Sequence, residues 1–103
     1  HPSDAVLVVD IIQSLVHSGY KIIPSDTSLF SEIDILNLDN KVTLLIYNGK
    51  AVIIIGEHSP STHNIFASQL VQILIDKGLN VNNIKTMLNT EVLSKEIKDL
   101  FLF

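Results

Sequence analysis

The sequence contains no cysteine and no arginine. Without cysteine, disulfides, thiolate zinc sites and thiol catalysis are all excluded. The seven cationic side chains are therefore all lysines, and the net charge at pH 7 is −4. Arginine is the usual residue for binding phosphates and guanine edges through paired hydrogen bonds, whereas lysine contacts phosphates as a point charge. Specific nucleic-acid binding is therefore not expected.

The chain also lacks any run of about 18 apolar residues, so no membrane span is expected. The apolar residues 5–12 follow no basic region and are interrupted by Asp10, which argues against a signal peptide. We therefore expect a soluble intracellular protein, although no residue specifies a compartment. Hydrophobic residues make up 47% of the 103 residues, enough for one core, which predicts a single domain over residues 1–103.

A hairpin signal lies in residues 42–55. Two apolar runs, residues 42–47 and 51–55, flank Asn48-Gly49. Asn-Gly suits a type I′ turn because both central positions of that turn need positive φ. The second run is apolar at successive positions, so both faces of its strand should be covered, which predicts a place at the centre of a sheet.

Apolar periodicity in the rest of the chain predicts the other helices and strands of the domain. A first helix is expected from Ser3 or Asp4 to about Ser18, and its wide apolar surface predicts burial on most sides. The order of elements is α-β-β-β-β-α-β-α. We predict an α/β domain with a mixed sheet of four or five strands and helices packed on it. The remaining elements are strands over residues 20–23, 32–38 and 83–88 and helices over residues 60–77 and 90–101.

The order of several segments along the chain resembles that of a known protein family. A helix is followed by GYKII, then EIDIL, then an apolar strand that ends in an acid, and then a helix. Over residues 7–76 this order resembles the restriction-endonuclease-like family of PD-(D/E)xK proteins. The resemblance implies a metal-dependent nuclease in which Asp34 matches the metal aspartate and Glu57 the second acid. Carboxylate oxygens suit Mg²⁺ or Mn²⁺, which would be the cofactor.

The lysine of that family motif is missing. It orients and polarises the attacking water, but the position two after Glu57 is Ser59, and no lysine lies between residues 51 and 76. An additional strand also separates the two acids. We therefore expect a degenerate hydrolytic site with no catalytic residue, metal or cofactor. The nuclease that uses Asp34 and Glu57 is kept as the alternative.

Residues 56–71, GEHSPSTHNIFASQLV, resemble the strand-to-helix junction of proteasome assembly chaperones of the small, third-subunit type. Proteins of that family bind partners and catalyse nothing. Glu57, His58 and His63 gather at this helix start and are the binding candidates. Two imidazoles and a carboxylate are also able to bind a metal. The simpler interpretation is that polar residues gather there because the free N–H groups of the helix need acceptors.

The last four residues, LFLF, are apolar without interruption. Successive helical residues point about 100° apart, so one stripe cannot bury them all. We predict an interface at Leu100, Phe101 and Phe103, used in a homodimer or with another protein. Packing of the last Phe on its own core is the alternative. The favoured function is a non-catalytic protein-interaction or assembly module.

Overall fold

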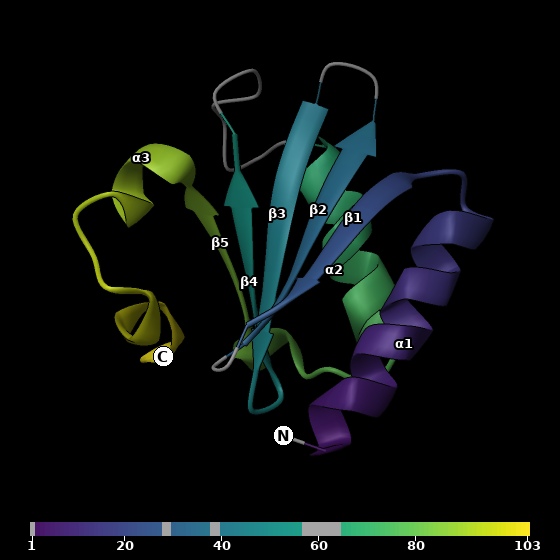
Figure 1. The fold of residues 1–103 in the computed structure, drawn as a ribbon, viewed down its shortest axis with the longest axis horizontal. Helices are drawn as coiled ribbons and strands as arrows, with labels where there is room; N and C mark the ends of the chain where they lie inside the picture. The colour runs from purple at the N-terminus through teal and green to yellow at the C-terminus, as the bar shows by residue number, and fades with distance from the viewer. Residues whose placement is uncertain (1, 28–29, 38–39, 57–64) are drawn as a thin grey trace.

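The computed structural model describes residues 2–27, 30–37, 40–56 and 65–103. Five strands pair in the order β1-β2-β3-β4-β5, antiparallel except for the parallel pair of β4 and β5. The predicted α/β class, mixed sheet and element order are confirmed (Figure 1). The elements are α1 (Pro2–His17), β1 (Lys21–Asp26), β2 (Ser31–Asn37), β3 (Asn40–Tyr47), β4 (Lys50–Ile55), α2 (Ile65–Asp76), η1 (Val81–Asn83), β5 (Ile84–Leu88), α3 (Asn89–Val92) and η2 (Ile97–Phe101).

The two faces of the sheet carry cores of different size. On the first face, α1 and α2 pack against the sheet (Figure 1) and enclose the larger core. On the second face, η2 encloses a smaller core with β3, β4 and β5, made of Leu45, Val52, Met87, Leu100 and Phe101. Within the described residues, no helix has both the length and the apolar character to cross a membrane.

The hairpin of β3 and β4 forms as the sequence predicts. Asn48 and Gly49 both have positive φ, 50° and 75°, as a type I′ turn requires. β4 is covered on both faces, because Ile53 lies in the larger core and Val52 in the smaller one. The middle strand of the sheet is β3 rather than β4, so the expected central position of β4 is wrong by one strand.

β1 continues past Pro24 to Asp26, whereas the sequence predicts that the strand ends at this proline. Proline removes one backbone donor, which breaks a ladder in the middle of a sheet but is tolerated at an edge. β1 is an edge strand that pairs with β2 alone. Pro24 therefore interrupts the free edge instead of ending the strand, and it makes that edge a poor template for a further strand.

Two expectations about helices are wrong. α1 is not buried on most sides, because its outward residues Val6, Val9 and Val16 are exposed. The helix expected over residues 90–101 is divided into the four-residue α3 and the 3₁₀ helix η2. This break turns the chain back so that η2 reaches the second face. Burial of the apolar side chains of η2 there stabilises the chain more than one continuous helix over these residues would. The expected start of the second helix at residues 60–62 lies outside the described residues.

Asp4 ties α1 to the hairpin turn. Its two carboxylate oxygens accept hydrogen bonds from the backbone N–H groups of Asn48, at 2.7 Å, and Gly49, at 2.9 Å. Asp4 is buried and lies in the first turn of α1, where a negative charge also suits the helix dipole. One side chain therefore fixes the position of the helix relative to the turn between β3 and β4.

Replacing Asp4 with alanine removes the acceptor from two turn N–H groups. We expect Asp4→Ala to lower the free energy of unfolding by about 1–3 kcal/mol, the cost of unpaired polar groups at a buried site. Urea unfolding measures the change. Asp10→Ala, on the exposed side of the same helix, is the control and should shift stability by less than about 0.5 kcal/mol. Equal losses in the two variants would contradict the role of Asp4.

Candidate interaction surface

The second face of the sheet is only partly covered. η2 lies over β4 and its neighbours, whereas β1 and β2 lie away from it (Figure 1). Strand alternation and register place one set of side chains on this uncovered part, which we call the open half: Ile23, Glu32, Asp34, Leu36, Lys41 and Thr43. Ile23 is exposed there. The open half is thus a three-stranded surface with apolar and charged side chains side by side.

Asp34 lies in the middle of the open half. Its Oδ1 accepts a hydrogen bond from Thr43 Oγ1 at 2.8 Å, and its Oδ2 lies 3.8 Å from Lys41 Nζ. Both partners come from β3, so the carboxylate links β2 to β3. An ion pair this exposed contributes about 0.2–1 kcal/mol. Asp34 therefore presents a paired carboxylate on the surface.

The nuclease hypothesis requires Asp34 and Glu57 to hold one metal ion. Glu57, like the binding candidates His58 and His63, lies outside the described residues. In the register, Asp34 faces Thr43 and Thr43 faces Ile54, so β3 separates Asp34 from β4, the strand that leads to Glu57. In the part of the chain that the structure describes, no three His, Asp or Glu side chains are grouped to hold a metal. The pairing of Asp34 with Glu57 stays a prediction.

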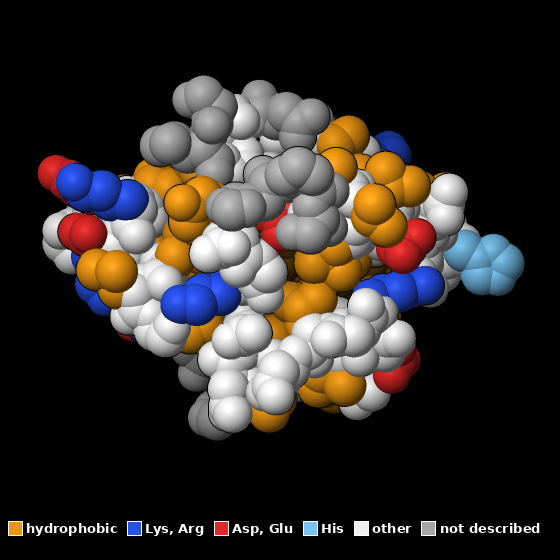
Figure 2. Space-filling model, turned by 90° about the horizontal axis from the view of Figure 1, so that it is seen from below, with side chains coloured by type: hydrophobic (Ala, Val, Ile, Leu, Met, Phe, Trp, Pro, Cys, Tyr) orange, Lys and Arg blue, Asp and Glu red, His pale blue; other side chains and the backbone are white. Residues whose placement is uncertain are grey.

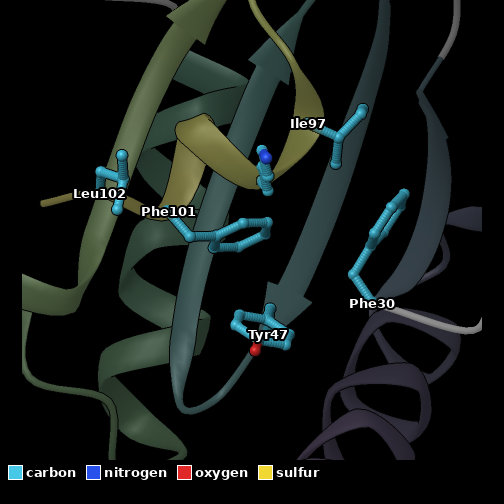
Figure 3. Close-up of a pocket in the computed structure, with 6 residues that line it drawn as sticks. Phe30, Tyr47, Ile97, Phe101 and Leu102 are labelled. Carbon is cyan, nitrogen blue, oxygen red and sulfur yellow. The ribbon is translucent and has the colours of Figure 1, made fainter.

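A hollow of about 270 Å³ opens where the second face meets η2. We call it the aromatic groove; it is lined by Phe30, Tyr47, Ile97, Lys98, Phe101 and Leu102. Phe30 lies across the groove from Phe101, with Tyr47 and Ile97 between them on opposite sides (Figure 3). The rings of Tyr47 and Phe101 are 5.5 Å apart and tilted by 57°, a favourable aromatic geometry. Lys98 is the single charged residue among the six.

The C-terminal residues divide into buried and exposed ones. Leu100 and Phe101 are 1% and 6% exposed within the smaller core, whereas Leu102 is 76% exposed. The segment folds as η2 and packs two of its four apolar residues on the sheet, whereas the last two stay exposed, as expected if one stripe cannot bury them all. Leu100 and Phe101 therefore present little surface to a partner. Phe103, the third residue of the predicted interface, remains exposed.

Lys50 holds the C-terminal residues against the sheet, a contact the sequence analysis missed. Its Nζ donates hydrogen bonds to the backbone oxygens of Phe101, at 3.1 Å, and of Phe103. The Phe103 ring lies 5.1 Å from Lys50 Nζ and 5.7 Å from Lys85 Nζ, within range of cation–π attraction. The available signal was strand alternation, which places both lysines on the same face as Val52 and Met87.

No protein-family model, curated protein or solved structure matches this chain. Its described part combines an apolar groove with hydrogen-bonded or ion-paired polar residues, an arrangement suited to recognising apolar side chains of another molecule.

Two leucines, one in η2 and one directly after it, test the packing of the C-terminal segment. Leu100→Ala removes a fully buried side chain and should cost about 2–5 kcal/mol of unfolding free energy. Leu102→Ala is the matched control, since it deletes the same atoms from an exposed position, and should cost less than about 0.5 kcal/mol. Chemical denaturation of both variants gives the comparison. A small effect of Leu100→Ala would mean that η2 is not packed on the sheet.

Proposed function

We propose that this chain is a non-catalytic protein-interaction or assembly module that binds a protein partner through the aromatic groove and the open half. The observation that carries the proposal is the groove itself, in which the partly exposed rings of Phe30 and Tyr47 flank the buried ring of Phe101. Tyrosine and phenylalanine are enriched in protein interfaces, and the residues that dominate binding lie in pockets of this kind.

The charges around the groove also favour a protein partner over nucleic acid. Lys98 lies 3.4 Å from Glu96 and Lys41 lies 3.8 Å from Asp34, so two cations on this face have acidic neighbours, whereas Lys50 and Lys85 lie against the Phe103 ring. A nucleic-acid surface needs an excess of positive charge to neutralise phosphates. The net charge of −4 does not supply that excess, and an apolar centre with a polar rim is the usual composition of a protein interface.

The contacts of the Asp34 carboxylate also favour a non-catalytic module. It already interacts with Thr43 and Lys41, so binding a metal would require it to give up or share these contacts. Its observed contacts join two strands, which is a structural role. In the proposed module Asp34 contributes to the polar rim beside the groove.

Capture of a partner from a lysate of the source organism tests this proposal when groove variants are compared with a control. Leu102→Glu adds a charge at the groove and Ile23→Glu adds one on the open half, both at exposed positions that should tolerate the change. We expect each variant to lose at least about 90% of a partner that the wild-type chain retains.

Val81→Glu is the matched control, because Val81 is also exposed but belongs to η1, outside the groove lining. It should retain the partner. Retention by Leu102→Glu and Ile23→Glu, or equal loss in all three variants, would overturn the proposed surface.

The nuclease alternative is tested separately. We expect the purified chain not to cleave DNA or RNA with Mg²⁺ or Mn²⁺, because the motif lysine is missing and Asp34 is already paired. Gel analysis of single- and double-stranded substrates measures cleavage. Metal-dependent cleavage that disappears in Asp34→Ala but persists in Asp10→Ala would restore the enzyme hypothesis.

A further inference from the structure

α1 carries a second apolar stripe on the side away from the core. Ile11 and Leu15 of α1 are buried, whereas Val6, Val9 and Val16 are 66%, 53% and 56% exposed, and Gln13 is exposed between them. With about 100° between successive residues, positions 6, 9, 13 and 16 fall within about 80° opposite Ile11. Hydrophobic side chains are visible at the right of Figure 2, where α1 lies.

The spacing of this stripe fits another helix. Positions 6, 9, 13 and 16 are separated by three, four and three residues, which are the a, d, a and d positions of a heptad repeat. Such a seam is complementary to a facing α-helix whose side chains fit between its own. Helix formation does not explain the choice of residue, because valine is a poorer helix former than leucine or alanine.

We propose that a second copy of this chain covers the stripe, with the two α1 helices packed in parallel about a two-fold axis. This inference rests on the proposed function, because it names a partner of the module. It uses a different surface, since α1 lies on the first face of the sheet and the aromatic groove on the second.

Gln13 favours the parallel arrangement. In a parallel pair each seam residue meets its counterpart, so the two Gln13 amides can donate and accept hydrogen bonds with each other while valine meets valine. In an antiparallel pair aligned over the same positions, Gln13 meets Val9 instead. Each amide would then be buried against an apolar side chain without a partner, which is costly.

The flanking charge favours the same arrangement. Asp10 lies beside the seam at an e position. In the antiparallel alignment, the two Asp10 side chains approach each other near the two-fold axis and repel. In the parallel alignment, Asp10 lies beside Ala5 of the partner subunit, and no like charges meet. The sequence of this one face is therefore complementary to itself in the parallel orientation.

A single introduced cysteine tests the pairing, because the chain has no other thiol. Val9 is a d position near the middle of the seam, and facing d residues of a parallel pair come within the roughly 5.5–6 Å between Cα atoms that suits a disulfide. We expect oxidised Val9→Cys to run as a covalent dimer on a non-reducing gel. Val81→Cys, at an exposed position of η1, is the control and should stay monomeric.

Failure of Val9→Cys to cross-link beyond the level of Val81→Cys would overturn the parallel pair. Cross-linking that needs the double variant Val9→Cys/Gln13→Cys would also overturn it, because that result requires antiparallel helices.

Sedimentation provides a test without a covalent bond. We expect the wild-type chain and Val81→Glu to be dimeric at about 100 μM and Val9→Glu to be monomeric. At concentrations low enough for the wild type to dissociate, Val9→Glu should melt at the same temperature as the wild type. Val9→Glu should still capture the partner that Leu102→Glu loses, since the groove lies on the other face. A monomeric wild-type chain would overturn the α1 pair while leaving the groove proposal standing.

Discussion

Burial of β4 on both faces is the constraint on which the rest of the structure depends. Ile53 requires a cover on the first face, which α1 and α2 supply, and Val52 requires one on the second face, which η2 supplies. The two covers are unequal, because two full helices lie on the first face and a five-residue 3₁₀ helix on the second. The open half and the aromatic groove follow directly, since so short a segment covers β4 and its neighbours but leaves β1 and β2 accessible.

Local sequence signals predicted the parts of the fold that local chemistry decides. Asn48-Gly49 fixed the hairpin because positive φ at both positions is a property of those residues. The exposure of α1 could not be predicted in the same way, because periodicity shows which positions are apolar but not how many neighbours surround the helix. The break after α3 was missed because it depends on the attraction of Leu100 and Phe101 to a distant sheet face. Asp4 was missed as a turn acceptor because its partners lie 44 and 45 residues away.

Only part of the candidate surface could be predicted from the sequence. Alternation in β2 indicates that Asp34 shares a face with Glu32, but its contacts with Thr43 and Lys41 depend on the register between β2 and β3. The aromatic groove joins Phe30 to η2, so only the folded chain reveals it. The binding candidates Glu57, His58 and His63 fall outside the described residues. The surface proposed for binding is consequently built from residues that the sequence alone did not bring together.

The relation between the two proposed surfaces explains how a chain this small would serve in assembly. The sheet separates the valine stripe of α1 from the aromatic groove, so pairing through α1 leaves the groove of each copy facing away from the partner. A parallel two-fold pair would then present two identical grooves on its outer sides. Two grooves held at a fixed separation bind a partner with repeated sites more tightly than one, because the second contact forms at high effective concentration. If one hollow of about 270 Å³ binds such a partner only weakly, the proposed pairing through α1 would raise the affinity by presenting two hollows together.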